Sequence, residues 1–267
     1  MSDAVADVVL VDVSDNVATI TLNRGPARNA LNRALKAELT RAFVAADSDP
    51  DVRVIILTGA DPAFCAGLDL KELGDASSGL LDAAGADGGV QPDGTTGPFP
   101  AVSKPVIGAI NGVAVTGGFE LALHCDFLIA SDRARFGDTH ARVGVMPGWG
   151  LTVLLPRIIG IRRAREMSFT GNFMTADEAL QWGLVNHVVP HEELLPFCRK
   201  LAADIVSNNA DGVSAIRETY RQIESSDTIE HWAIESSNAK SWRAREFSAD
   251  EVAKRRAGIM ERGRNQN

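Results

Sequence analysis

The sequence predicts an α/β (α+β) fold in which β-β-α units repeat and helices follow them. Three short runs at residues 54–58, 105–110 and 127–130 are almost wholly apolar and rich in β-branched residues, as is typical of strands covered on both faces. A helical period lies between the last two runs, at residues 118–124, and helical patterns dominate after Trp149. We therefore expect stacked sheets with a helical C-terminal part.

The first elements are a predicted hairpin and a helix. Residues 8–13 and 17–22 are partly alternating, β-branched runs, and the polar residues 14–16 between them favour a turn. From Asn32 onward the apolar residues recur with a helical period, which ends at residues 47–50. We expect antiparallel strands at the start of the chain and a helix before the first buried strand.

Helices are expected after Trp149 at residues 151–159, 162–169 and 176–182, with three longer ones beyond residue 192. Thr175 and Glu178 have the spacing of a capping box, in which the hydroxyl and the carboxylate bind free amides at a helix start. We divide the chain into a core domain at residues 1–200 and a C-terminal helical oligomerisation region at residues 201–267.

The segment at residues 74–99 interrupts these patterns. Gly, Ala, Ser and Asp dominate it, which predicts a loop. Two interpretations remain open: a surface insertion without a role, and a flap that closes over a substrate.

Composition excludes several classes of protein. The chain has 267 residues, 45% of them hydrophobic, and 27 basic against 35 acidic side chains, for a net charge of −8. An acidic chain without a long basic block does not favour a nucleic-acid or anionic-membrane partner. No apolar run approaches the roughly 18 residues of a membrane helix, and the N-terminus lacks a signal pattern, so we expect a cytoplasmic location.

The cysteines and histidines do not predict a metal site. Cys65, Cys125 and Cys198 are widely spaced and odd in number, so we interpret them as reduced core thiols rather than as disulfides or zinc ligands. The histidines lack ligand spacing such as His-x-x-x-His.

Two glycine-containing turns carry the predicted chemistry. Residues 64–70 (Phe-Cys-Ala-Gly-Leu-Asp-Leu) and 116–120 (Thr-Gly-Gly-Phe-Glu) each follow an apolar strand and lead into a helix. Glycine at such a turn allows a ligand to approach the backbone, whose amides then act as donors. Amides from both turns would form an oxyanion hole if they converge on one carbonyl oxygen.

The same turns resemble motifs of the crotonase (enoyl-CoA hydratase/isomerase) superfamily. Residues 64–72 are similar to its FxAGxDxxE segment, and residues 111–126 are similar to its NGxxxGGGxELxxxCD segment. Further similar segments lie in the same order at residues 22–32, 136–148 and 179–185. The resemblance covers roughly residues 8–200 and implies a superhelix of stacked ββα sheets.

The resemblance also implies an acyl-CoA thioester substrate, with coenzyme A present only as part of that substrate and no further cofactor. Its carbonyl oxygen would be bound by the amides of Ala66 and Gly117. Other residues are implied to line the CoA groove: Arg28, Leu68, Asp69 and Leu70. Trp149 would lie near the acyl chain, where its ring either narrows the pocket or packs in the core.

Glu120 matches the first of two catalytic glutamates that hydratases place around a water molecule. His140 stands where a typical hydratase has the second one. Three roles of His140 remain open: a replacement acid/base, a residue that adapts the site to another acyl-CoA reaction, and a structural residue that leaves catalysis weak. Asp138 would orient the ring if this stretch is extended.

Most directly, the resemblance implies an enoyl-CoA hydratase that adds water to a 2-enoyl-CoA. The alternatives are an enoyl-CoA isomerase with Glu120 as its single base, and a non-catalytic acyl-CoA binder. The superfamily also implies a homotrimer or a hexamer (dimer of trimers) whose C-terminal helices cover a neighbouring site. Basic residues in this C-terminal part would reach CoA phosphates or form a solvated helix face: Lys254, Arg255, Arg256, Arg262 and Arg264.

Overall fold

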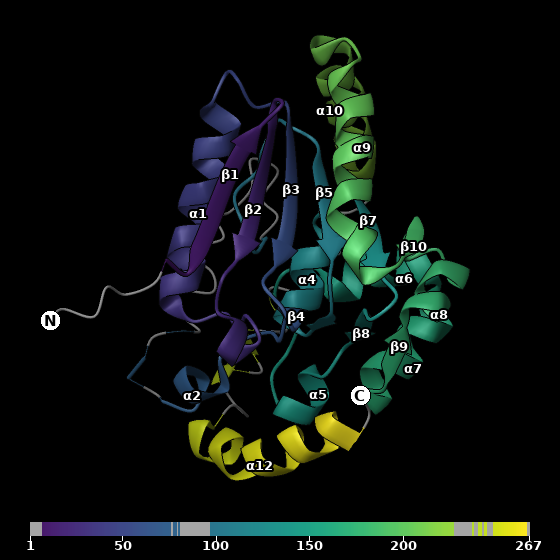
Figure 1. Cartoon of the computed structure of the whole chain (residues 1–267). Helices are drawn as coiled ribbons and strands as arrows, with labels where there is room; N and C mark the ends of the chain where they lie inside the picture. Colours follow the sequence, from purple (N-terminus) through teal and green to yellow (C-terminus); the bar gives the residue numbers. More distant parts are fainter. Residues whose placement is uncertain are drawn as a thin grey trace, which may run out of the picture.

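The computed structural model describes residues 7–75, 77–78, 80, 97–226, 237, 240–241, 243–244 and 248–265. Most of the predicted loop at residues 74–99 therefore lies outside the described residues. In the described part of the chain, the strands form one six-stranded and one four-stranded sheet. The fold is the expected mixture of helices and sheets (Figure 1).

The larger sheet contains the predicted hairpin and the three buried runs. Its strand order is β1 (Val9–Ser14), β2 (Val17–Leu22), β3 (Val54–Gly59), β5 (Val106–Ile110), β7 (Phe127–Ser131) and β10 (His187–Val189). β1 and β2 pair antiparallel, as predicted, and the later neighbours pair parallel.

β3 shows why the buried runs are apolar throughout. Ile55 and Leu57 point into the core between the two sheets, whereas Val54 and Ile56 point to a second cluster on the opposite face. That second face is covered by α9 (Leu194–Val206), through residues that include Leu194 and Cys198. A strand buried on both faces cannot alternate with polar residues.

The smaller sheet was not predicted strand by strand. It consists of β4 (Ala63–Cys65), β6 (Val113–Val115), β8 (Arg135–Gly137) and β9 (Phe173–Thr175), in that order. Each strand has only three residues, too few for a period to stand out in the sequence. β4, β6 and β8 follow β3, β5 and β7 along the chain, which gives the stacked arrangement expected of the repeated units.

Most predicted helices are present with small shifts at their ends: α1 (Arg33–Ser48), α2 (Leu70–Leu73), α4 (Gly117–Leu123), α6 (Leu151–Ile159), α7 (Ile161–Thr170) and α8 (Ala176–Gln181). The capping box of Thr175 and Glu178 forms at the start of α8. The other short helices are η1 (Gly25–Ala27), α5 (His140–Val143) and η2 (His191–Glu193). Cys65, Cys125 and Cys198 are buried and unpaired.

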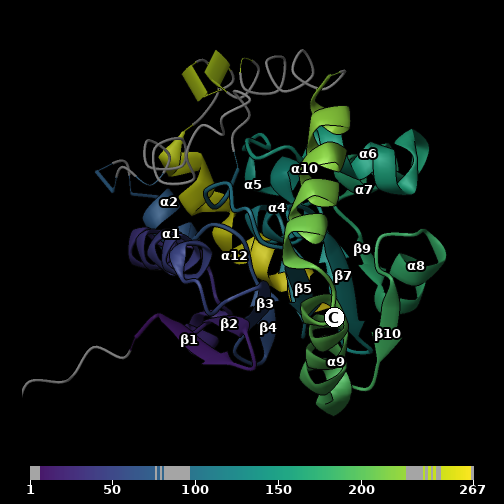
Figure 2. The same cartoon turned by 90° about the horizontal axis from the view of Figure 1, so that it is seen from above.

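The C-terminal helices are α10 (Ala210–Ser226) and α12 (Ala249–Asn265). α12 runs beneath the core and packs against α2 and α5 of its own chain (Figures 1 and 2). Val252 of α12 is buried with Leu73 and Val143. Among the described residues, none forms a helix that is both long and apolar enough to span a membrane.

Gly118 sets the distance between α4 and β4. An ideal Cβ on Gly118 would lie 2.2 Å from the carbonyl oxygen of Cys65 and 2.7 Å from its Cβ. Both partners are backbone or core atoms, so neither can move away easily. Only glycine lets α4 begin this close to the strand.

We therefore expect Gly118→Ala to lower the free energy of unfolding by roughly 2 kcal/mol or more, because the added methyl overpacks the core. Urea unfolding followed by circular dichroism measures this. The matched control is Gly258→Ala in α12, where an added Cβ meets nothing within 4 Å and alanine favours the helix by about 0.5–1 kcal/mol. Equal stability of Gly118→Ala and the unchanged protein would contradict this packing.

Candidate active site

The two glycine-containing turns meet in the structure. Gly67 has a positive φ of 81°, and an ideal Cβ there would lie 2.9 Å from the carbonyl oxygen of Val115 and 3.0 Å from Cβ of Thr116. The turn after β4 is therefore packed directly against the turn that begins α4. The next residues along the two turns are Leu68 and Gly117, so the site begins between them.

The Ala66 amide is not available to bind a substrate carbonyl oxygen, contrary to the prediction. It donates a hydrogen bond of 3.0 Å to the carbonyl oxygen of Arg28, so it cannot also be a free oxyanion donor. Leu68, expected only to line the CoA groove, has an amide without an acceptor in the described part of the chain. Gly117 is the first residue of α4, where amides lack intrahelical acceptors. The free pair is thus Leu68 and Gly117.

Glu120 lies in the first turn of α4 and is 2% exposed. Its Oε1 accepts hydrogen bonds from the amides of Trp149 at 2.8 Å and Gly148 at 3.2 Å. Its Oε2 lies 3.5 Å from Nε2 of His140. One carboxylate oxygen is therefore fixed by the backbone, and the other is directed at the second predicted site residue.

His140 is 5% exposed and is held from its other side by Asp138. Oδ1 of Asp138 accepts from the backbone amide of His140 at 3.1 Å and lies 2.6 Å from Nδ1 of the ring. The sequence offered Asp138 as an orienting residue if the stretch were extended. The stretch is not extended, because the chain turns into α5 at this point. The side chain of Asp138 instead accepts from the backbone amide of His140, two residues later, as in an Asx turn.

The charges of this cluster are coupled. Burial lowers the pKa of His140, but hydrogen bonds and charge from Asp138 and Glu120 outweigh it and raise the pKa to about 9. For Asp138 burial acts in the opposite direction and raises the pKa. The hydrogen bond and charge of His140, together with a hydrogen bond from Ser168, outweigh burial and bring the pKa of Asp138 below its usual range. Both shifts favour the charged forms, an imidazolium at His140 and a carboxylate at Asp138.

A threonine pair joins the two halves of the site. Thr116 and Thr139 are buried, and their hydroxyl oxygens are 2.6 Å apart. Thr116 has φ 54° and ψ −122°, a left-handed region that a β-branched side chain rarely adopts. The hydrogen bond connects the turn of Gly117 to the segment of His140. Neither threonine was predicted to be a site residue. The available signal was Thr116, which stands at the first of the three consecutive glycines in the NGxxxGGGxELxxxCD motif.

Trp149 covers the turn of Gly117. It is 5% exposed, and Cζ3 of its ring would lie 3.1 Å from an ideal Cβ on Gly117. Its carbonyl oxygen is 2.6 Å from Nε2 of His124. Burial lowers the pKa of His124, so the neutral ring donates this bond. The ring of Trp149 thus packs in the core and also borders the site, so the two interpretations of this residue do not exclude each other.

Of the residues predicted for the CoA groove, Leu68, Asp69 and Leu70 directly follow Gly67, and the carbonyl oxygen of Arg28 binds the Ala66 amide beside this turn. Arg28 is exposed, whereas Asp69 pairs with Arg24 at 3.1 Å and caps α2 by accepting from the amide of Lys71. Leu70 packs beside the small cluster that includes Val252 of α12. These contacts give Asp69 and Leu70 structural roles as well.

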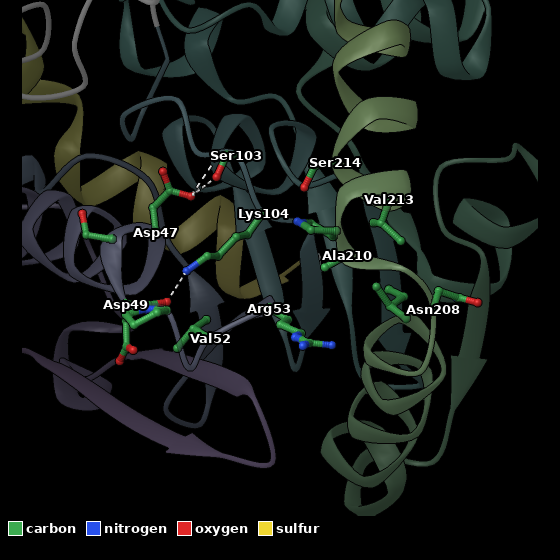
Figure 3. Close-up of a pocket in the computed structure, with 14 residues that line it drawn as sticks. Asp47, Asp49, Val52, Arg53, Ser103, Lys104, Asn208, Ala210, Val213 and Ser214 are labelled. Carbon is green, nitrogen blue, oxygen red and sulfur yellow. Dashed lines mark hydrogen bonds between the residues drawn. The ribbon is translucent and has the colours of Figure 1, made fainter.

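A separate groove of about 340 Å³ lies between the C-terminal end of α1 and the junction of α9 and α10 (Figure 3). It contains none of the predicted site residues and borders the starts of β3 and β5, away from Glu120. Its charged groups have local partners: Asp47 accepts from Ser103, and Lys104 donates to the carbonyl oxygens of Ala46 and Asp49. The groove is a junction between elements.

A serine, a histidine and an aspartate also form a chain elsewhere. Nδ1 of His191 is 3.1 Å from Oγ of Ser131, and its Nε2 is 3.1 Å from Oδ2 of Asp61. Ser131 is fully buried and donates to Asp132, so its hydroxyl cannot reach a substrate. The described residues likewise contain no group of three or more His, Cys, Asp or Glu side chains suited to a metal ion.

We expect the threonine pair to have a measurable coupling energy. Thr116→Val and Thr139→Val each remove one hydroxyl, and a double-mutant cycle in urea unfolding should give a coupling of about 1 kcal/mol. Thr116→Gly is the matched control, because it removes the same hydroxyl and also relieves the positive φ, so it should be more stable than Thr116→Val. A coupling near zero would show that the hydroxyls do not bind one another.

Comparisons with known proteins agree on one family. Residues 12–263 match the enoyl-CoA hydratase/isomerase family. A probable peroxisomal enoyl-CoA hydratase of Arabidopsis thaliana is 45% identical over 204 residues, covering 76% of this chain and 74% of that protein. The crystal structure of an enoyl-CoA hydratase from Mycobacterium tuberculosis H37Rv is 49% identical, with a TM-score of 0.79, and covers 89% of this chain and 98% of the other. With this agreement added to the site, the chain belongs to the enoyl-CoA hydratase/isomerase family.

Proposed function

We propose that this protein is an enoyl-CoA hydratase, which adds water across the double bond of a 2-enoyl-CoA thioester. The observation that carries the proposal is the buried pair of Glu120 and His140, 3.5 Å apart, beside two turns with free amides. Hydration requires a base for water and an acid for the α-carbon within one small site. The relatives named as enoyl-CoA hydratases support the same reaction.

In this mechanism, the amides of Leu68 and Gly117 bind the thioester carbonyl oxygen. Attack of water at the β-carbon pushes electrons toward this oxygen, and the developing enolate is stabilised by donors that are already in place. Each donor of this kind contributes about 3 kcal/mol to transition-state stabilisation. The packing of Gly67 on Val115 fixes the two turns relative to each other, so no backbone reorganisation is needed during the reaction.

Glu120 is the residue that activates water. Its Oε1 is occupied by the amides of Gly148 and Trp149, which leaves Oε2 as the basic atom. His140 is the second acid/base, reaching the site through Nε2. Of the roles left open by the sequence, the buried contact with Glu120 supports that of a replacement acid/base. An isomerase needs only one base, whereas both groups of this pair are held for proton transfer.

We also propose that the protein works as a homo-oligomer, a trimer or a dimer of trimers. Ile216 and Tyr220 lie four residues apart on α10 and are 61% and 65% exposed. Large apolar side chains gathered on one helix face are typical of an interface. α12 packs on its own chain, so α10 rather than α12 offers the contact to a neighbour.

Glu120→Gln is expected to lower kcat for crotonyl-CoA hydration by roughly 10²–10⁴, because the amide cannot accept the proton from water. Its remaining oxygen still accepts from Gly148 and Trp149, which preserves the local fold. Loss of the conjugated double bond, followed spectrophotometrically and checked by the mass of the product, measures the rate.

The control is Glu38→Gln, an exposed change on α1, which should leave the rate unchanged. Unreduced hydration by Glu120→Gln would contradict the assignment of the base. A mass-neutral regioisomer as the product of the unchanged protein would indicate an isomerase, and binding without a product would leave only an acyl-CoA binder.

A further inference from the structure

We propose that Asp138 is a positioning residue that keeps His140 as an imidazolium, so that His140 acts only as the proton donor and Glu120 is the only base of the site. This inference rests on the proposed hydration and assigns the direction of each proton transfer. It is carried by the geometry of the Asp138, His140 and Glu120 side chains.

The position of Asp138 fixes both the orientation of the ring and its tautomer. One oxygen, Oδ1, lies 2.6 Å from Nδ1 and also accepts from the His140 amide at 3.1 Å. A carboxylate accepts only, so the proton of Nδ1 must point to Asp138. Nε2 is then the atom that faces Glu120. With Asp138 2% exposed, water does not compete for this bond.

The contact between Nε2 and Glu120 also requires the proton. Oε2 of Glu120 lies 3.5 Å from Nε2, and a neutral ring bonded to Asp138 through Nδ1–H would present a lone pair to this carboxylate. Two acceptors facing one another in a buried site are unfavourable, whereas an imidazolium donates to both neighbours. The pKa of about 9 has the same cause.

The charges explain why an aspartate accompanies the histidine. Asp138 and the imidazolium together are neutral, and the pair has one transferable proton, on Nε2. A protonated carboxylic acid is also neutral and has one transferable proton. The pair therefore supplies the acid without adding net charge to a site that already contains the Glu120 carboxylate, and a buried unpaired cation is avoided.

The protons balance over one turnover. An O–H bond of water breaks and its proton moves to Oε2 of Glu120, while the oxygen forms a bond to the β-carbon. The electron pair of the C=C bond becomes an enolate bound by the two amides. A C–H bond then forms at the α-carbon with the proton of Nε2. Return of the proton from Glu120 to His140, across the 3.5 Å contact, restores the starting state.

In the described part of the chain, the charged side chains that pair with His140 are those of Asp138 and Glu120. α4 contributes Glu120, its own segment contributes Asp138 and Arg142, and Ser168 of α7 bonds to Asp138. The guanidinium of Arg142 packs instead against Gly171 and the Phe173 ring. α12 packs on α5, and its described charged residues nearest in sequence to the buried Val252 are Asp250, Lys254 and Arg256.

The experiment is the pH dependence of kcat/KM for crotonyl-CoA in the unchanged enzyme and in Asp138→Asn. A donor must be protonated, so the rate should fall as the pH rises through the pKa of His140, about 9. Without the charge of Asp138 this pKa drops, and the alkaline fall should move at least one pH unit lower, with kcat reduced roughly 10–100-fold at neutral pH. Asp177→Asn, an exposed change, is the control.

The opposite result is equally specific. If neutral His140 were a base, kcat/KM would rise as the pH increases through the pKa of His140. Asp138→Asn would then move this acidic limb of the profile to lower pH. That outcome, or an unshifted profile, overturns the proposal. Absence of hydration by the unchanged enzyme would instead refute the proposed function, so the two failures are distinguishable.

A second measurement does not depend on turnover or on the variant. The chain has only five histidines, so ¹⁵N-histidine labelling with His140→Gln for assignment resolves the ring of His140 in the resting enzyme. We expect both nitrogens to have imidazolium shifts at pH 7.5 and a proton on Nδ1. A neutral ring at this pH would overturn the proposal.

Discussion

The close packing of two backbone turns is the constraint on which the site depends. Gly67 rests on the carbonyl oxygen of Val115, and Gly118 rests on that of Cys65, at distances that any side chain would prevent. These contacts join the turns that follow β4 and β6, neighbouring strands of the smaller sheet, and leave the amides of Leu68 and Gly117 without acceptors in the described part of the chain. They also set the start of α4, so that Glu120 lies inside the core. Fold and function therefore depend on the same glycines.

The second constraint is electrostatic. Asp138, His140 and Glu120 are each at most 5% exposed, and burial of ionised groups is costly unless each is paired and hydrogen-bonded. The amides of Gly148 and Trp149, together with the ring of His140, provide these partners. Because Trp149 also contacts His124 and the turn of Gly117, a single segment both binds the Glu120 carboxylate and covers that turn.

Much of the fold could be predicted because its signals are local. The hairpin, the buried strands and the capping box of Thr175 each depend on residues close in sequence. The three-residue strands of the smaller sheet could not be predicted, because pairing with distant strands defines them rather than their own pattern. The motif resemblance indicated Glu120, Gly117 and His140, which the structure brings into one buried region.

The finer features of the site could not be predicted because they depend on tertiary contacts. Whether the Ala66 or the Leu68 amide is free is decided by the carbonyl of Arg28, nearly forty residues away in sequence. Asp138 contacts His140 through a turn at the start of α5. From the sequence, the contact could be argued only from the alternation of side chains along an extended strand. The positive φ of Thr116 is tolerated beside a hydrogen bond to Thr139, and nothing near Thr116 in the sequence indicates that partner.

Isotope labelling shows directly whether the buried pair adds water to the conjugated double bond. The purified protein would be incubated with crotonyl-CoA, once in ¹⁸O-labelled water and once in D₂O, and the products analysed by mass spectrometry with fragmentation. We expect a 3-hydroxyacyl-CoA with ¹⁸O at the β-carbon and, from D₂O, one deuterium at the α-carbon. A product that acquires deuterium but no oxygen would contradict hydration and show that the same site only moves protons.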